Sequence, residues 1–349
     1  MNMMRGALLG LVLAMPAAAE ETIDLTVASS HPTVVPWVGM IQTHFMAKTD
    51  EILAQTGNYK IAWNEAFGGQ LYKANATLTS VEEGVTDIGW VFSFLEQAKL
   101  PLSQGSSNAP FATSNPPVLL DVMQSLIDTN DAFREEWESH NLKVLGLTAT
   151  DLYDFYLKEP IAGIDDLNGR KISAPGVLGN WLRGTGANAV DGALTTYYTD
   201  VQTGVSDGVL SLALGALPIK LYEVAPYIAR FDGGTVFSGA VAINRDSWDG
   251  LPEEVQNAMI EAGAYYTKAH GQDLVDRHEF ALNKMVELGA TIIPMPEGET
   301  AKWVAKLPNI VEDWAAPLEA RGVPAKAFLA AYMDGLRAAG EKPARDWDK

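Results

Sequence analysis

The sequence predicts an α/β protein. Short apolar or alternating segments, typical of β-strands, are separated by stretches whose apolar residues recur at helical spacing. Such alternation favours mainly parallel sheets covered by helices. A chain of 349 residues is about twice the size of a typical domain, which leaves room for two such units.

Seven segments have the pattern of strands, with two-residue periodicity or a short apolar run. They cover residues 23–28, 59–63, 87–91, 142–147, 152–157, 235–243 and 290–293. Helical spacing covers residues 40–55 and 117–127, then 252–288, with further helices up to residue 339. Gly263 and Gly271 are candidate breaks in the long stretch 252–288, because glycine destabilises a helix interior.

The N-terminus has the pattern of a secretory signal peptide. Arg5 precedes an apolar run at 6–15, and three alanines at 17–19 supply the small residues of a cleavage site. The predicted signal peptide is therefore 1–19, and the chain is expected to be exported. A retained membrane anchor is the alternative, but the apolar run is too short to cross a bilayer, and no later segment is long enough.

Charge and cysteine content exclude several classes of function. The formal net charge is −19, and it becomes −20 when Arg5 is removed with the signal peptide. Such acidity argues against a nucleic-acid partner. The chain has no cysteine, so it has no disulfide, no cysteine nucleophile and no thiolate metal site.

Two short segments resemble each other across the two halves of the chain. Residues 81–88 (VEEGVTDI) and 201–208 (VQTGVSDG) both have the pattern of a helix end, a glycine and an aspartate entering a strand. A recurrent turn that arose by chance is one explanation. The other is a pair of similar α/β lobes that share a cleft at their strand ends, where such sheets usually bind ligands.

Catalytic motifs are weak. Residues 204–208 match the pattern around a nucleophilic serine, Ser206, but the predicted order is helix, turn, strand, the reverse of what that chemistry needs. Residues 184–189 resemble a dinucleotide fingerprint yet follow a helical segment. We expect no catalytic residue, and a secreted hydrolase that uses Ser206 is the rival hypothesis.

Histidine and acidic residues cluster at 270–279. His270 and His278 are not spaced four apart, so they do not share one helical face as a zinc pair would, and the nearby Asp273, Asp276 and Glu279 are typical of a solvated surface. We expect no metal and no cofactor.

Three segments in the middle of the chain carry a family resemblance. They are residues 165–172 (DDLNGRKI), 198–208 (YTDVQTGVSDG) and 220–224 (KLYEV). In this order, and behind a signal peptide, they resemble the DctP-like solute-binding subunits of tripartite ATP-independent periplasmic (TRAP) transporters. The resemblance extends loosely over nearly the whole mature chain, including residues 68–71 and 251–256.

The resemblance implies a two-lobed periplasmic-binding-protein-like fold with a ligand cleft between the lobes and a long helix spanning both. The expected division is 20–150 plus 237–275 for lobe I and 151–236 plus 276–349 for lobe II. The implied function is that of a periplasmic receptor, usually monomeric, that closes on a small solute and delivers it to TRAP membrane permease subunits. A receptor of the same fold that feeds a membrane sensor is an alternative.

Three positions depart from the family pattern. The arginine that usually ends the strand of the first motif, where it grips a substrate carboxylate, is Ser173. A second usual arginine falls near Tyr153, and the asparagine that the family usually has three residues after the Asp-Gly pair of the second motif is Ser211. The resemblance therefore implies that the carboxylate clamp is missing.

Aromatic and acidic residues stand near these positions instead. By strand alternation, Asp151, Tyr153 and Phe155 are expected to share one face. Rings with a carboxylate suit a compact cation, so the leading hypothesis is a small amine or amino alcohol of about the size of ethanolamine. The expected ligand-binding residues are Ser30, Trp37, Trp90, Phe92, Asp151, Tyr153, Phe155, Ser173, Trp181 and Ser211.

Other interpretations of these residues stay open. Any one of the aromatic residues is at least as well explained as ordinary core. The ligand is alternatively a neutral polar or aromatic molecule, or an acid held by Lys73, Lys158 or Arg183.

Overall fold

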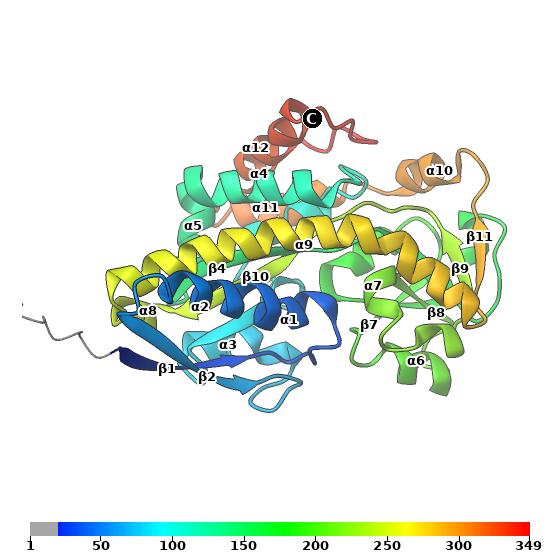
Figure 1. Cartoon of the computed structure of the whole chain (residues 1–349). Helices are drawn as coiled ribbons and strands as arrows, with labels where there is room; N and C mark the ends of the chain where they lie inside the picture. Colours follow the sequence, from blue (N-terminus) through cyan, green and yellow to red (C-terminus); the bar gives the residue numbers. More distant parts are fainter. Residues whose placement is uncertain (1–19) are drawn as a thin grey trace, which may run out of the picture.

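The computed structural model describes residues 20–349, which form two β-sheets flanked by helices (Figure 1). The predicted signal peptide lies outside the described residues. The first sheet has the order β2-β1-β3-β10-β4, and the second has the order β11-β9-β5-β8-β6-β7. The strands are β1 (Glu21–Ala28), β2 (Tyr59–Ala66), β3 (Ile88–Phe92), β4 (Leu142–Ala149), β5 (Tyr153–Leu157), β6 (Lys171–Ala174), β7 (Asn188–Asp191), β8 (Gly208–Leu212), β9 (Tyr227–Arg230), β10 (Phe237–Asn244) and β11 (Thr291–Pro294).

Helices cover both sheets, and every strand and helix segment expected from periodicity is present. The helices are α1 (Pro36–Met40), α2 (Ala47–Leu53), α3 (Thr77–Glu82), α4 (Pro116–Thr129), α5 (Asp131–Glu138), α6 (Tyr197–Thr203), α7 (Ala213–Ala216), α8 (Arg245–Asp249), α9 (Glu253–Glu287), α10 (Glu299–Lys306), α11 (Ile310–Glu319) and α12 (Ala325–Ala338). A turn of π-helix, η1 (Ile41–Met46), joins α1 to α2.

Both sheets are mainly parallel, as the sequence predicts, and each contains one strand that runs against the others. Strand β10 is antiparallel to β3 and β4, and strand β5 is antiparallel to β8 and β9. Both strands follow a crossing of the chain from one sheet to the other. The other strands of each sheet end at the side where the chain crosses to the other sheet. A strand that follows a crossing enters its sheet from that same side, so it runs antiparallel to its neighbours.

The two similar segments at 81–88 and 201–208 adopt the same local structure, as the sequence predicts. Each has a helix end, a glycine with positive φ and a strand, with Gly84 at +69° and Gly204 at +79°. In each, an aspartate carboxylate accepts a backbone N–H at 2.8 Å from the neighbouring parallel strand, Asp87 from Thr26 and Asp207 from Lys171. The two lobes therefore contain a repeated α/β unit.

Helix α9 is continuous, so Gly263 and Gly271 do not break it. It runs along both lobes in Figure 1, packing on β4 and α2 of the first lobe and on α7 and β11 of the second. A Cβ on Gly263 would lie 2.0 Å from the carbonyl oxygen of Leu145 in β4. The glycine therefore permits the close approach of helix to sheet.

The C-terminal helices correct the predicted lobe boundary. Helix α12 packs against α4, and α11 lies against the 3₁₀ turn η5 (Ser106–Asn108), so the chain from 310 onward covers the first lobe rather than the second. The ring of Phe328 in α12 lies 4.9 Å from that of Phe133 in α5. Amphipathic periodicity predicts that α12 buries one face but does not name the partner of that face.

Glu136 of α5 is a buried carboxyl in the first lobe. It accepts hydrogen bonds from the backbone N–H groups of Leu102 and Ser103 and, at 2.7 Å, from the Ser103 hydroxyl. Burial raises its pKa from 4.5 to about 7, although these hydrogen bonds oppose the shift. The group therefore binds its proton more tightly in the folded than in the unfolded protein.

This shift predicts that the stability contributed by Glu136 is complete below pH 4.5 and is lost as the pH rises towards 7. A shift of this size corresponds to about 3 kcal/mol. Relative to Glu136→Gln, which has no ionisation, wild type should lose that amount of unfolding free energy between pH 4 and 8. Urea unfolding across this range tests the prediction, with Glu135→Gln on the exposed face of α5 as the control. Parallel profiles for wild type and Glu136→Gln would contradict it.

Candidate functional site

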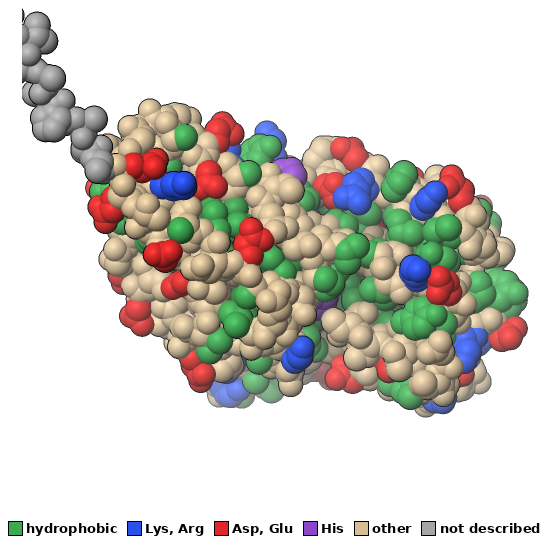
Figure 2. Space-filling model, turned by 60° about the horizontal axis from the view of Figure 1, so that its bottom comes forward, with side chains coloured by type: hydrophobic (Ala, Val, Ile, Leu, Met, Phe, Trp, Pro, Cys, Tyr) green, Lys and Arg blue, Asp and Glu red, His purple; other side chains and the backbone are tan. Residues whose placement is uncertain are grey.

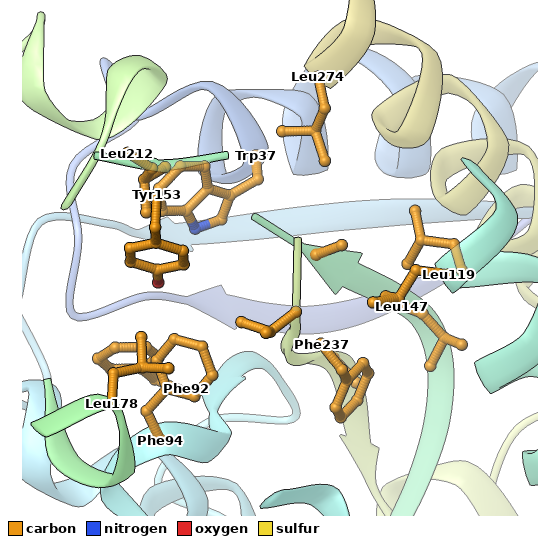
Figure 3. Packing of buried hydrophobic residues seen from close by; sticks show 14 of the residues in the cluster. Trp37, Phe92, Phe94, Leu119, Leu147, Tyr153, Leu178, Leu212, Phe237 and Leu274 are labelled. Carbon is orange, nitrogen blue, oxygen red and sulfur yellow. The ribbon is translucent and has the colours of Figure 1, made fainter. Parts of the chain in front are cut away.

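A small cavity lies between the two lobes. Both lobes supply its walls, so opening the lobes would dismantle it. From the first lobe come His31, Trp37, Trp90, Phe92, Phe94 and Ser238. From the second come Tyr153, Pro175, Leu194, Tyr197, Ser211 and Leu212. Figure 3 shows Trp37, Tyr153 and Leu212 gathered on one side, with Phe92 and Phe94 opposite.

Strand alternation and local packing position the rings of the first lobe. Trp90 and Phe92 are two residues apart on β3, so both project from the same face, and their rings stack at 5.2 Å. The indole of Trp90 is fixed by a hydrogen bond of 3.0 Å from its Nε1 to the hydroxyl of Thr148. Trp37, in the first turn of α1, brings its ring to 5.8 Å from that of Trp90.

His31 is a wall residue that the sequence analysis missed. Its Nδ1 lies 2.9 Å from the hydroxyl of Ser30, and its ring meets Trp90 edge-on at 5.2 Å. Burial lowers the pKa of His31 to about 4, so the imidazole is neutral at neutral pH. Ser30 orients His31 rather than lining the cavity. The available signal was the position of both residues just after a strand, where α/β sheets bind ligands.

Three polar atoms at the cavity have no hydrogen-bond partner among the described residues. They are the Trp37 indole Nε1, the Tyr153 hydroxyl and the Ser211 hydroxyl, and all three are buried. Tyr153 begins β5 and Ser211 lies in the adjacent strand β8, so the second lobe presents both from its sheet. Buried polar atoms are normally paired, so these three are available to a ligand.

The described residues that line the cavity include no Asp, Glu, Lys or Arg. The three cations proposed as acid-binding alternatives are engaged elsewhere. Lys73 donates to the carbonyl of Gly69 at 2.8 Å, Lys158 donates to that of Val201 at 2.8 Å, and Arg183 pairs with Asp313 at 2.6 Å. On the face shown in Figure 2, charged side chains of both signs are scattered over both lobes.

Asp151 does not share a face with Tyr153 and Phe155, which corrects the strand-based expectation. Its carboxylate accepts from the backbone N–H of Leu214 and lies 2.9 Å from Nδ1 of His278 on α9. The strand begins only at Tyr153, so alternation does not extend back to Asp151.

Three other expected site residues lie outside the walls. Phe155 packs against Phe231 and Trp303, with ring centroids 5.5 and 5.0 Å away. Trp181 donates to the carbonyl of Ser107 at 2.7 Å and supports Tyr153 from behind. Ser173 is buried in β6, two residues before the wall residue Pro175. The expected residues Trp37, Trp90, Phe92, Tyr153 and Ser211 do converge on the cavity.

Ser206 lies in the turn between α6 and β8, so the order is helix, turn, strand. Its hydroxyl is buried and has no partner among the described residues. In the described part of the chain, no base is hydrogen-bonded to this hydroxyl, as activation of a nucleophilic serine would require.

Two α/β lobes, a helix along both and a cavity between them define the class of two-lobed ligand-binding receptors. Within that class, the chain belongs to the bacterial extracellular solute-binding protein family 7 (DctP), whose model matches residues 29–317. Members of this family are periplasmic binding receptors rather than enzymes, in agreement with the resemblance in the sequence.

Curated relatives are distant. A solute-binding protein of Sulfitobacter sp. (strain NAS-14.1) is 24% identical over 255 residues, covering 71% of this chain and 75% of that protein. The C4-dicarboxylate-binding periplasmic protein DctP of Rhodobacter capsulatus is 27% identical over 192 residues, covering 53% of this chain and 57% of that protein.

Solved structures confirm the fold. A TRAP solute-binding protein from Rhodoferax ferrireducens, in complex with benzoate, has a TM-score of 0.80 at 18% identity, covering 91% of this chain and 98% of that one. One from Sulfitobacter sp. NAS-14.1, with bound β-D-galacturonate, has a TM-score of 0.76 at 18% identity, covering 89% and 100%. Among the described residues, no helix has the length and apolar character needed to span a membrane.

Proposed function

We propose that this protein is the receptor of a TRAP-type uptake system, exported by its signal peptide, and that it delivers its solute to membrane permease subunits. The division of the cavity walls between two lobes supports this proposal. A ligand that touches both lobes favours the closed state, because it gains its full set of contacts only there. Closure is then the signal that a membrane partner would recognise.

For the substrate, we propose a small amine or amino alcohol whose ammonium group carries alkyl substituents. The observation that carries this is a cavity walled by aromatic rings and free of charged side chains. Aromatic faces attract a cation by about 2 kcal/mol when water is excluded. A primary ammonium would leave three donors to satisfy, whereas an alkylated one needs few hydrogen bonds. With Asp151 bonded to His278 and Leu214, the absence of a carboxylate favours the alkylated form.

A neutral aromatic alcohol is the second candidate. The hydroxyl group of such a ligand would hydrogen-bond to the free polar atoms of the cavity, which are the Trp37 Nε1, the Tyr153 hydroxyl and the Ser211 hydroxyl. The aromatic side chains of the walls would pack on the ring of the ligand. The benzoate and β-D-galacturonate found with the solved relatives are acids. The walls of this cavity hold no cation to pair with a carboxylate, and His31 is neutral.

Titration calorimetry with four matched compounds tests the substrate class. Choline represents the alkylated amino alcohol, 3,3-dimethylbutan-1-ol its uncharged isostere, benzyl alcohol the neutral aromatic ligand and benzoate the acid. We expect choline to bind at least tenfold more tightly than its isostere, because the two differ in charge and not in shape. Preference for benzyl alcohol would favour the second candidate. Tight binding of benzoate alone would overturn both.

A further inference from the structure

Three of the connections between the lobes meet at one place. The chain first crosses from β4 to β5 through residues 150–152 and returns from β9 to β10 through residues 231–236. Backbone hydrogen bonds join the two crossings. The N–H of Thr150 donates to the carbonyl oxygen of Val236 at 3.0 Å, and the N–H of Gly233 donates to the carbonyl oxygen of Tyr153 at 2.8 Å. Helix α9, which runs along both lobes, contacts the first crossing where His278 meets Asp151.

Three potential metal ligands converge there from separate elements. They are Asp154 of β5, Asp232 of the second crossing and His278 of α9, and one ligand atom from each lies within 4.8 Å of the other two. Bonds of 2.0–2.2 Å to a shared ion would bring such atoms to about 3–4 Å apart. The cluster therefore needs only a small adjustment to surround one ion.

Two of these residues keep a buried coordinating atom that has no partner within residues 20–349. Asp154 accepts the N–H groups of Phe231 and Asp232 on Oδ1, at 2.7 and 3.0 Å, while Oδ2 is unbonded. The Nε2 atom of His278 is also unbonded. The two residues are 1% and 6% exposed, and such buried polar atoms normally have partners.

Asp151 completes the arrangement expected of a metal-binding histidine. Its Oδ2 lies 2.9 Å from Nδ1 of His278, and because a carboxylate only accepts, Nδ1 carries a proton. In the neutral imidazole, Nε2 then keeps its lone pair. Histidine ligands usually bond a carboxylate through the second ring nitrogen in this way. The bond thus fixes both the tautomer and the ring.

The local charge also favours a cation. The cluster contains Asp154 and Asp232, and Asp151 and Glu279 lie beside it. Within residues 20–349, the only basic partner in the ion pairs of these four acids, besides His278, is Arg230. Arg230 pairs with Asp232 at 3.0 Å and with Glu279. Among the residues that the structure describes, the buried Asp151 and Asp154 have no guanidinium or ammonium partner.

We propose that Asp154, Asp232 and His278 form a divalent metal site at the hinge, with Asp151 as the residue that orients His278. One imidazole and two carboxylates suit a transition metal such as Zn²⁺ or Co²⁺. The ion would tie β5, the second crossing and α9 together, and so stiffen the connection about which the lobes move. The site is separate from the ligand cavity and does not depend on the proposed substrate.

Co²⁺ titration of the chelator-treated protein, followed by visible absorption, tests the site. We expect one Co²⁺ to bind per chain and to give d–d absorption bands, which disappear when Zn²⁺ displaces the Co²⁺. We also expect Zn²⁺ to raise the melting temperature of the protein. His278→Gln and Asp154→Asn should lower the affinity at least tenfold. Asp151→Asn should weaken binding by about 10–100-fold without abolishing it, since it acts through His278.

Two further variants secure the interpretation. Asp232→Asn changes a side chain that is 46% exposed, so its loss of Co²⁺ binding should occur in a folded protein. His44→Gln on η1 removes a histidine of the other lobe and should leave binding unchanged. A wild-type protein that binds no Co²⁺, or equal binding in wild type and Asp232→Asn, would overturn the proposal.

Discussion

Replacing Gly263 with alanine is expected to lower the free energy of unfolding by about 3 kcal/mol, the upper part of the range for overpacked cores. The added Cβ would lie 2.0 Å from the carbonyl oxygen of Leu145 and 2.6 Å from the carbonyl carbon of the same residue. These are backbone atoms of β4, so α9 or the strand must shift. The gain of about 1 kcal/mol in helix propensity for alanine over glycine does not offset this cost. Urea unfolding monitored by circular dichroism measures the change.

Gly271→Ala is the matched control on the same helix. There the nearest atom to an added Cβ is Cδ1 of Leu120, 3.1 Å away, which is the end of a flexible side chain. The free energy of unfolding of Gly271→Ala should lie within about 1 kcal/mol of wild type, because the gain in helix propensity and the tighter contact oppose each other. If Gly263→Ala is as stable as Gly271→Ala, the close approach of α9 to β4 is not a constraint on the fold.

Replacing Trp37 with leucine is expected to weaken choline binding by about 30-fold, which corresponds to the 2 kcal/mol of a desolvated cation–π contact. Leucine keeps an apolar wall but removes the ring and its quadrupole. The indole Nε1 has no partner among the described residues, so the substitution breaks no hydrogen bond of the side chain. Binding of 3,3-dimethylbutan-1-ol should fall much less, since it carries no charge. Calorimetry on both compounds gives the ratio.

Trp63→Leu serves as the control for this experiment. Trp63 lies on β2 outside the cavity walls, with Nε1 bonded to the Asp50 carboxylate at 3.0 Å, so choline affinity should be retained. If Trp37→Leu weakens the binding of choline and of 3,3-dimethylbutan-1-ol equally, the effect comes from apolar contact alone. Unchanged binding of choline would show that Trp37 is not part of the site.

Periodicity was sufficient for most elements of the fold. It predicted β1, β4 and α4 within a few residues, and the repeated helix–glycine–aspartate pattern predicted the paired units that end in β3 and β8. It did not predict the antiparallel direction of β5 and β10, because alternation is the same for either direction. Direction was decided by where the chain crosses between the sheets.

The candidate site was only partly predictable. Tyr153 and Ser211 were found because they occupy positions where the family usually has polar ligand contacts, and both line the cavity. Leu194 and Tyr197 were missed, since nothing in their local sequence separates a wall residue from a core residue. Phe155 was expected at the site, but its ring packs on Trp303.

The sequence alone determined the α/β class, the two repeated units and the resemblance to solute-binding receptors, because these depend on residue spacing and on motifs of adjacent residues. Only the tertiary structure decided which rings enclose the cavity, that Asp151 bonds to His278, and that α12 covers the first lobe. The physical reason is that periodicity reports that a face is buried, not what it is buried against. Cavities and buried ion pairs arise where elements far apart in the chain meet.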